Sequence, residues 1–237
     1  MIAKIRVLFR WFRQWDLIVL TAALVAALGI WAFIGIADAV REGETQSFDE
    51  RILKALRDPT DPSKPLGPAW LGEVGRDLTA LGGVAVVSLV TASVVGFLLI
   101  TRHYGAMLLL LSATLGGLLL STLLKHSFDR PRPQVVPHLS YVNTSSFPSG
   151  HSMLSAVVYL TLGSLLARLV QRRVLKLYFV GVALVLTGLT GLSRVYMGVH
   201  YPTDVLAGWS AGLVWALVCW LAARWLQSRR AVERSLE

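Results

Sequence analysis

The sequence predicts an all-α integral membrane protein, a bundle of six transmembrane helices with a short interfacial helix between the first and the second. The composition supports this fold class, because 54% of the 237 residues are hydrophobic and 16% are charged, whereas soluble domains carry about 25% charged residues. The mean hydropathy is +0.60. The regular spacing of long apolar runs favours a single membrane domain over residues 1–237.

Each apolar run has about 20 residues, enough for a helix to cross the hydrocarbon core of a bilayer. The six runs cover residues 17–36, 81–100, 106–124, 153–170, 174–192 and 205–226. Glycines within them permit close helix approach, and Gly208 and Gly212 form the Gly-x-x-x-Gly packing pattern. One match of this pattern does not define an oligomeric state.

The first 16 residues are basic and aromatic, and we expect them to lie on the cytoplasmic face of the membrane. Ala37-Asp38-Ala39, which follows the first apolar run, resembles a signal-peptidase site. Signal sequences, however, have hydrophobic regions of only about 7–15 residues. The first run is therefore predicted to be an uncleaved transmembrane helix.

Residues 40–79 form the longest polar segment, which we expect at the extracytoplasmic membrane surface. Residues 47–50, Ser-Phe-Asp-Glu, match a capping box, and apolar side chains then recur on one helical face at positions 48, 52, 53 and 56. Prolines 59, 62, 65 and 68 predict an irregular connection after this short helix. The favoured interpretation is that the helix packs on the bundle; the alternative is that it guides a lipid to a site.

Basic residues gather in short segments on one predicted face of the bundle. Besides the N-terminal cluster, these are Arg102, Arg168, Arg172, Arg173, Lys176, Arg224, Arg229 and Arg230. The positive-inside rule then places both termini in the cytoplasm. The net charge of +9 is thus better explained by topology and anionic lipids than by binding of nucleic acid. Four cations on the opposite face break this bias, which suggests another function: Lys125, Arg130, Arg132 and Arg194.

The residue types on this opposite face favour a site for phosphate. Cations beside a low-dielectric membrane are unfavourable unless an anion joins them, and both the guanidinium fork and the ammonium group suit phosphate. We therefore single out Lys125, Arg132 and Arg194. Ser149-Gly150-His151 opens the fourth apolar run, where the first amides of a helix point toward an anion and glycine allows close backbone approach.

His200 and Asp204 are four residues apart at the predicted start of the sixth helix, which places them on the same face. The carboxylate can accept a proton from one imidazole nitrogen and leave the other as a nucleophile with a free lone pair. His151 is then a candidate general acid for the leaving oxygen. The sequence therefore predicts one phosphate-handling site built from residues 125–204.

These stretches resemble the signature of the type 2 phosphatidic acid phosphatase superfamily of membrane lipid phosphatases. That signature is Lys, six residues, Arg-Pro; then Pro-Ser-Gly-His; then Ser-Arg, five residues, His, three residues, Asp. The sequence contains Lys125 to Arg132-Pro133, Pro148 to His151, and Ser193-Arg194 to His200 and Asp204. Every spacing of the pattern is present.

The resemblance implies a mechanism through a phosphohistidine. His200 would attack phosphorus, Asp204 would orient His200, and His151 would protonate the leaving group and then activate water. The phosphoryl oxygens would be held by Lys125, Arg132, Arg194, Ser149 and the amide of Gly150. The resemblance also implies that neither a metal ion nor another cofactor is needed, and that the partners are a membrane lipid phosphate and the bilayer.

Bacterial members of the family act on several lipids in the plasma (inner) membrane. Undecaprenyl pyrophosphate is the leading expectation, with phosphatidylglycerol phosphate, phosphatidate and lipid A phosphates as alternatives. A non-catalytic transporter or lipid-binding protein would lack the nucleophile, which is present here. A serine hydrolase would need a Gly-x-Ser-x-Gly elbow and would leave the cations unexplained, while the related soluble haloperoxidases do not fit six apolar runs.

Several other polar residues receive no catalytic role. His103, His126 and His138 are expected to be structural or solvent-facing, because no compact metal-ligand spacing includes them. Arg130 has two interpretations, phosphate binding or exposure to water. Cys219 lies inside an apolar run and is expected to be a small buried hydrophobe, and a single cysteine excludes an intrachain disulfide.

Overall fold

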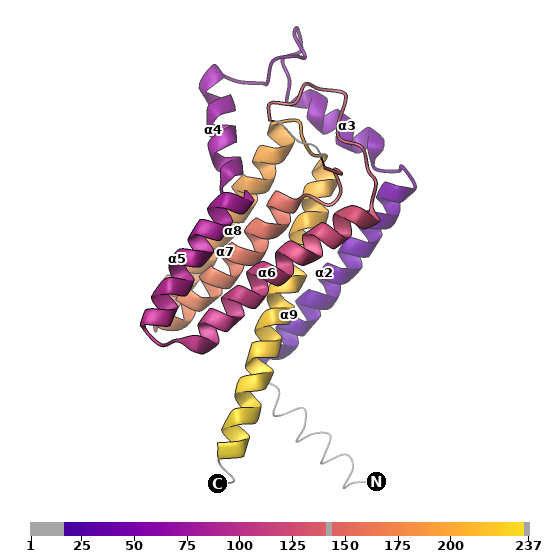
Figure 1. Cartoon of the computed structure of the whole chain (residues 1–237). Helices are drawn as coiled ribbons and strands as arrows, with labels where there is room; N and C mark the ends of the chain where they lie inside the picture. The colour runs from indigo at the N-terminus through magenta and orange to yellow at the C-terminus, as the bar shows by residue number, and fades with distance from the viewer. Residues whose placement is uncertain (1–16, 141–143, 235–237) are drawn as a thin grey trace, which may run out of the picture.

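The computed structural model describes residues 17–140 and 144–234. Along the described chain the helices are α2 (Leu17–Arg41), α3 (Gln46–Ala55), α4 (Ala69–Ala80), α5 (Val84–Ile100), α6 (Tyr104–Ser127), α7 (Gly150–Leu169), α8 (Arg173–Tyr196) and α9 (Pro202–Arg234). Figure 1 shows α2 and α5–α9 as a bundle, with α3, α4 and the long α6–α7 connection gathered at one end. The predicted membrane-surface segment 1–16 lies outside the described residues.

Five of these helices, α2, α6, α7, α8 and α9, are long and apolar enough to cross a membrane. The remaining predicted span, residues 81–100, corresponds to α5, which meets this test only together with α4, as a pair bent by 48°. The break includes Gly82, where an added Cβ would lie 2.4 Å from Thr190 Cγ2 on α8 and 2.7 Å from the carbonyl oxygen of His151 on α7. Glycine is therefore required where the bent span crosses its neighbours.

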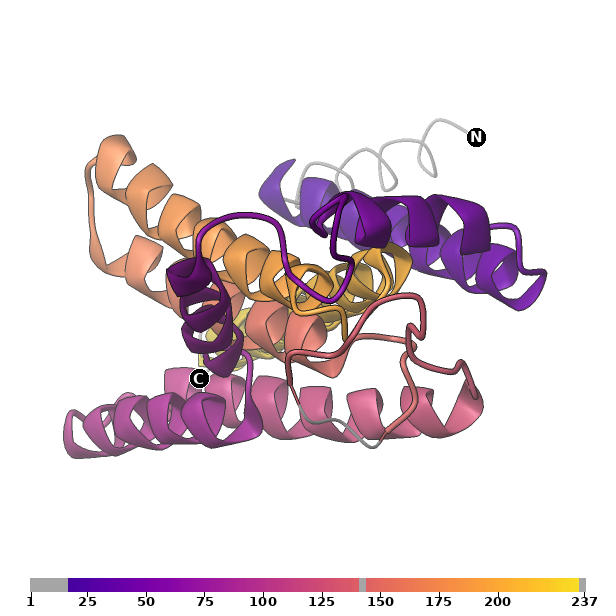
Figure 2. The same ribbon diagram turned by 90° about the horizontal axis from the view of Figure 1, so that it is seen from above.

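Helix α7 forms the centre of the bundle and packs most extensively against α8 and α9, while α2 lies along α9. Figure 2 shows α7 and α9 enclosed, with the α5–α6 pair on one side and α2 on the other. In its most apolar 18-residue window, α7 has 56% of its residues buried in the protein, against 6% for α2. Helix α2 therefore leaves most of its apolar surface for lipid.

The two glycines of the Gly-x-x-x-Gly pattern bring α9 against α7 within the same chain. A Cβ on Gly208 would lie 2.6 Å from the carbonyl oxygen of Ser149, and one on Gly212 would lie 2.5 Å from that of Met153. The backbones thus approach as closely as small residues allow. This contact fixes the first turns of α7 and α9 beside each other, and the Ser149 amide donates a hydrogen bond to the carbonyl oxygen of Asp204 at 2.9 Å.

The predicted capping box at residues 47–50 is wrong. Helix α3 begins at Gln46, and no side-chain hydrogen bond caps its first turn. Asp49 instead points into the protein with 0% exposure and accepts hydrogen bonds from the backbone and hydroxyl of Thr203. Leu53, one turn later, is equally buried, whereas Phe48 is 50% exposed. An acidic side chain thus belongs to the face by which α3 packs on the bundle.

Candidate active site

The residues predicted to form the site meet at one end of the bundle, beside α3 and the α6–α7 connection (Figure 1). Lys125 is in the last turn of α6, His151 lies in the first turn of α7, Arg194 is in the last turn of α8, and Asp204 is in the first turn of α9. Because successive helices run in opposite directions, two helix ends and two helix starts share this face. The structure therefore brings together segments that lie up to 79 residues apart in the sequence.

The imidazole of His200 lies between a carboxylate and a guanidinium. Its Nδ1 is 3.4 Å from Oδ2 of Asp204, and its Nε2 is 3.3 Å from an NH1 nitrogen of Arg132. A guanidinium can only donate hydrogen bonds, so Nε2 must carry the lone pair and Nδ1 the proton, which faces Asp204. The geometry thus leaves a free lone pair on Nε2, which faces the guanidinium of Arg132.

Burial keeps this histidine neutral. The side chain of His200 is 1% exposed, and burial lowers its pKa from the usual 6.5 to about 3, although Asp204 acts in the opposite direction. The positive charges of Arg194 and Arg132 add to the lowering. His200 therefore has a free lone pair throughout the physiological pH range.

Asp204 is fixed by contacts from three sides. Its Oδ2 accepts hydrogen bonds from the backbone amide of Tyr201 at 2.9 Å and from the hydroxyl of Ser146, and its Oδ1 accepts one from Arg130 at 2.6 Å. The carboxylate has 0% exposure. A charged group without access to water needs such a full set of donors, and the same donors hold Asp204 in position to orient His200.

Lys125, Arg132 and Arg194 lie close enough together for their charges to interact, and their side chains contact neutral oxygens. Lys125 donates to Thr144 Oγ1 and to the carbonyl of Ser145 at 3.1 Å each. Arg132 donates to the backbone carbonyls of Thr144 at 2.7 Å and Val199 at 2.6 Å. Burial lowers the pKa of the Arg132 guanidinium, and the charge of Asp204 opposes this effect. Among the described residues, none of the ion pairs involves any of these three cations.

Arg194 is the most deeply buried of the three cations. Its side chain is 2% exposed, one terminal nitrogen donates to Thr79 Oγ1 at 3.0 Å, and Nε has no hydrogen-bond partner among the described residues. A buried guanidinium with an unsatisfied donor is strongly unfavourable in isolation. The cluster of cations is therefore complementary to a bound anion, and its charge and shape suit the oxygens of a phosphoryl group.

The first turn of α7 forms another wall of the site. Ser149 is the N-cap, and its Oγ accepts hydrogen bonds from the amide and the hydroxyl of Ser152, so its own O–H remains free to donate. At Gly150 an added Cβ would lie 3.3 Å from Lys125 Cε, so the absence of a side chain lets the lysine cross the helix start. The first amides of α7 thus face the cation cluster.

His151 lies next to the break between α4 and α5. Its Nε2 is 3.7 Å from the position that a Cβ would take on Gly83. No hydrogen bond within the described part of the chain restrains the His151 ring, and the positive charge of Arg194 is close enough to act on it. The imidazole can therefore serve a substrate or a water molecule.

Arg130, for which the sequence left two interpretations, neither faces water nor belongs to the cation cluster. Its guanidinium lies between two carboxylates, 2.6 Å from Asp204 and 2.8 Å from Asp49, and 4.2 Å above the ring of Tyr201. Asp49 also holds Thr203, as described above. The structure thus adds Asp49 on α3 to the site as a residue that acts through Arg130 on Asp204.

Sequence reasoning missed Asp49 because an acidic residue near a helix start was interpreted as part of a capping box. One signal could have identified it: Asp49 lies one turn before Leu53, on the apolar face of α3. His138, in contrast, is structural as expected, because its Nε2 lies 2.6 Å from the carbonyl oxygen of Pro133. His103 contacts Thr101 at the other end of the bundle.

A helical membrane bundle that holds a neutral histidine between a carboxylate and three cations defines a class of membrane enzyme acting on phosphate groups. The sequence profile of the PAP2 superfamily matches residues 105–228. Phosphatidylglycerophosphatase B of Bacillus subtilis is 35% identical over 189 residues, which cover 77% of this chain and 86% of that protein. The chain therefore belongs to the PAP2 superfamily and is a multi-pass integral membrane lipid phosphatase.

Further relatives share parts of the chain or its fold. Lipid A 1-phosphatase of Rhizobium etli is 32% identical over 103 residues, 40% of each protein. The crystal structure of a transmembrane PAP2-type phosphatidylglycerolphosphate phosphatase from Bacillus subtilis has a TM-score of 0.73 at 31% identity, covering 82% of this chain and 93% of that one. Aquifex aeolicus LpxE, with a TM-score of 0.54, 24% identity and coverage of 72% and 91%, is similar in fold.

Proposed function

We propose that this enzyme removes a phosphate group from a membrane lipid through a phosphohistidine at His200. One observation supports this most strongly: the unprotonated Nε2 of a fully buried His200 lies 3.3 Å from the guanidinium of Arg132, while Nδ1 faces Asp204. A phosphoryl oxygen bound to Arg132 would place its phosphorus beside that lone pair. The nucleophile and the charge that attracts its target therefore share one location.

In the first step, Nε2 of His200 forms a bond to phosphorus while the bond from phosphorus to the lipid oxygen breaks. His151, in its protonated form, gives its proton to the leaving oxygen, so the lipid departs as an alcohol. The developing positive charge on His200 is balanced by Asp204, which Arg130, Ser146 and the Tyr201 amide hold in place. The negative charge on the transferred group stays within the cation cluster.

In the second step, water attacks phosphorus and the bond to Nε2 breaks. His151 has lost its proton in the first step and can now accept one from the water. The products are inorganic phosphate and the regenerated neutral His200. During both steps the phosphoryl oxygens are held by Lys125, Arg132 and Arg194 together with the O–H of Ser149 and the amide of Gly150.

For the substrate, we propose phosphatidylglycerol phosphate in place of undecaprenyl pyrophosphate, which the sequence had suggested first. The support is the similarity to a phosphatidylglycerophosphatase over most of both chains and to a solved phosphatidylglycerolphosphate phosphatase. The similarity to lipid A 1-phosphatase covers only 40% of each protein, so lipid A phosphates are a weaker alternative. The product would be phosphatidylglycerol.

We further propose that both termini face the cytoplasm, that the site faces the exterior or periplasm, and that the chain forms a single membrane domain. The support is the separation of charges along the bundle. Arg102, between α5 and α6, and Arg172 and Arg173, at the connection between α7 and α8, lie at the end opposite the candidate site. The positive-inside rule places such basic connections in the cytoplasm. A tag on either terminus should then resist a protease added to intact cells. Cleavage of both tags would show that the termini face the exterior and would contradict the proposed orientation.

The experiment that tests the function is phosphate release by the purified protein in detergent. Phosphatidylglycerol phosphate, undecaprenyl pyrophosphate, phosphatidate and a lipid A phosphate are compared side by side, with EDTA present and His200→Ala as the control. Preferred hydrolysis of phosphatidylglycerol phosphate that resists EDTA and is lost in the variant supports the proposal. Reversible loss of activity in EDTA would refute the metal-free mechanism, and preference for another lipid would refute the proposed substrate.

A further inference from the structure

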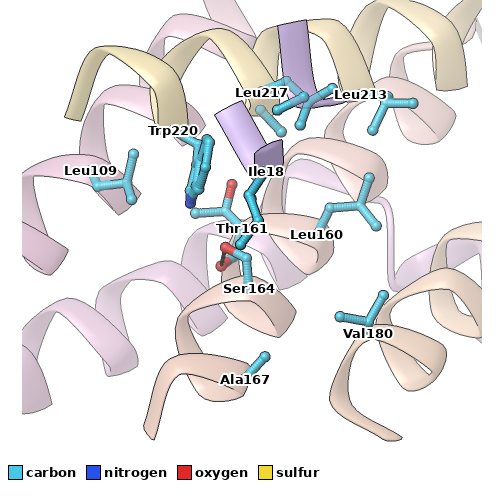
Figure 3. Close-up of a pocket in the computed structure, with 12 residues that line it drawn as sticks. Ile18, Leu109, Leu160, Thr161, Ser164, Ala167, Val180, Leu213, Leu217 and Trp220 are labelled. Atoms are coloured by element: carbon cyan, nitrogen blue, oxygen red, sulfur yellow. Dashed lines mark hydrogen bonds between the residues drawn. The ribbon is translucent and has the colours of Figure 1, made fainter. Parts of the chain in front are cut away.

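A cavity of about 300 Å³ lies between α2, α6, α7, α8 and α9, in the half of the bundle away from the active site (Figure 3). Its wall is mostly aliphatic, with contributions from Ile18, Leu109, Leu160, Val180 and Leu213. Leu160 is ten residues beyond the start of α7 at Gly150, about 15 Å along the helix at 1.5 Å per residue. The cavity is therefore separate from the catalytic residues.

Two arginines mark the end of this cavity. Trp220 lines the cavity, and the guanidinium groups of Arg168 and Arg224 lie 5.5 Å and 5.6 Å from the centre of its ring. Arg168 is 18 residues beyond the start of α7, about 27 Å along the helix. Because the hydrocarbon core is about 30 Å thick, the arginines lie at the level of the lipid headgroups in the leaflet opposite the active site.

The two guanidinium groups share one aromatic ring, so their like charges oppose each other. Among the described residues, no carboxylate forms an ion pair with Arg168. A phosphate diester bound to both groups would relieve this repulsion, because guanidinium binds phosphate through paired hydrogen bonds. Basic sites between transmembrane helices suit anionic lipid headgroups in this way.

A polar group in the cavity wall near Trp220 adds an independent observation. Thr161 is 4% exposed, and its hydroxyl has no hydrogen-bond partner among the described residues. Figure 3 shows the hydroxyls of Thr161 and Ser164 on the side of the cavity near Trp220. A buried hydroxyl without a partner is unfavourable, and the ester carbonyl of a glycerolipid, just below its phosphate, could accept its proton.

We propose that this cavity binds an anionic glycerophospholipid from the leaflet opposite the active site. Arg168 and Arg224 hold the phosphate, the Thr161 hydroxyl contacts an ester oxygen, and one acyl chain fills the aliphatic cavity. The lipid is a resident ligand and not a substrate, since its phosphate lies about 27 Å along α7 from the catalytic end. Binding would link α7, α9 and α2 and stabilise the folded bundle. This inference does not depend on the proposed substrate.

The test measures the unfolding temperature of the full-length protein in detergent during titration with phosphatidylglycerol or phosphatidylcholine. Saturating inorganic phosphate is present to occupy the catalytic site. Phosphatidylglycerol should raise the unfolding temperature of the wild type, and phosphatidylcholine should not. In Arg168→Gln/Arg224→Gln the apparent affinity for phosphatidylglycerol should fall at least about tenfold, while the exposed control Arg173→Gln should behave as the wild type.

A second variant separates the cavity from general attraction between charges. Ala216→Leu fills the cavity and leaves both arginines in place, so it too should weaken phosphatidylglycerol binding about tenfold or more. Ser164→Leu fills the cavity from α7 and replaces Ala216→Leu if that protein does not fold. Unchanged binding in the cavity-filling variant, unchanged binding in the double arginine variant, or equal stabilisation by phosphatidylcholine would each overturn the proposal.

Discussion

Arg130→Gln is expected to weaken both folding and catalysis, because the guanidinium of Arg130 lies between two carboxylates with 0% exposure, Asp49 and Asp204. Removing one partner from a buried ion pair costs about 3–5 kcal/mol of folding free energy. A hydrogen bond to a charged group, such as the one that Asp204 would lose, contributes about 1.5–3 kcal/mol of stabilising free energy. If this loss appears fully in the transition state, kcat falls about 10- to 150-fold, with little change in KM, because Arg130 does not face the cation cluster.

The double variant Asp49→Asn/Arg130→Gln tests whether Asp49 and Arg130 are coupled through their charges. In the wild type, two carboxylates and one guanidinium leave a net charge of −1 in the buried group. Arg130→Gln makes this charge −2, whereas the double variant restores −1. Neighbouring residues in one network show coupling energies of about 0.5–3 kcal/mol. The double variant should therefore be more stable than Arg130→Gln alone.

The assay is thermal unfolding in detergent, paired with steady-state hydrolysis of the lipid phosphate. Arg51→Gln is the matched control, because Arg51 is an exposed arginine on the same helix, α3. It should change neither quantity. Strictly additive effects of Asp49→Asn and Arg130→Gln in the double variant would refute the coupling, as would wild-type kcat in Arg130→Gln.

The remaining predictions concern charge, packing and pH. Arg194→Gln should raise KM and lower kcat/KM, because its buried guanidinium donates a hydrogen bond to Thr79 while its Nε has no hydrogen-bond partner among the described residues; unchanged kinetics would exclude it from phosphate binding. Gly212→Val should lower the unfolding temperature, since its Cβ would meet the Met153 carbonyl at 2.5 Å, and a wild-type value would contradict the predicted clash. Stability should fall as the pH decreases from about 6.5 toward about 3, because the unfolded chain protonates its histidine first while burial lowers the pKa of His200 to about 3; His200→Ala should show a shallower decline, and equal slopes in the two proteins would contradict the assignment.

The spans and the site pattern could be predicted from sequence because both depend on local spacing. Runs of about 20 apolar residues mark helices that cross a bilayer, and α2, α6, α7, α8 and α9 follow them. His200 and Asp204 are four residues apart, and although α9 begins only at Pro202, the turn before it still places Nδ1 of His200 3.4 Å from Oδ2 of Asp204. Such features require no knowledge of the tertiary structure.

The ion-pair network could not be predicted in this way. Arg130 meets Asp49 across 81 residues of sequence, and nothing in the local pattern of either residue specifies the other. The same holds for the break between α4 and α5, because the apolar run 81–100 looks continuous in sequence. The break lies at the start of this run, where Gly82 passes close to Thr190, and it is a property of the packed bundle.

Nε2 of His200 should become phosphorylated during turnover. Rapid mixing with lipid labelled with ³²P in the phosphomonoester, followed by an alkaline quench, should trap a phosphoenzyme that is stable to base and labile to acid. Peptide mapping should place the label on His200, and Asp204→Asn should slow its formation. A wild-type burst of released alcohol with no label on the protein, or label on another residue, would contradict the mechanism.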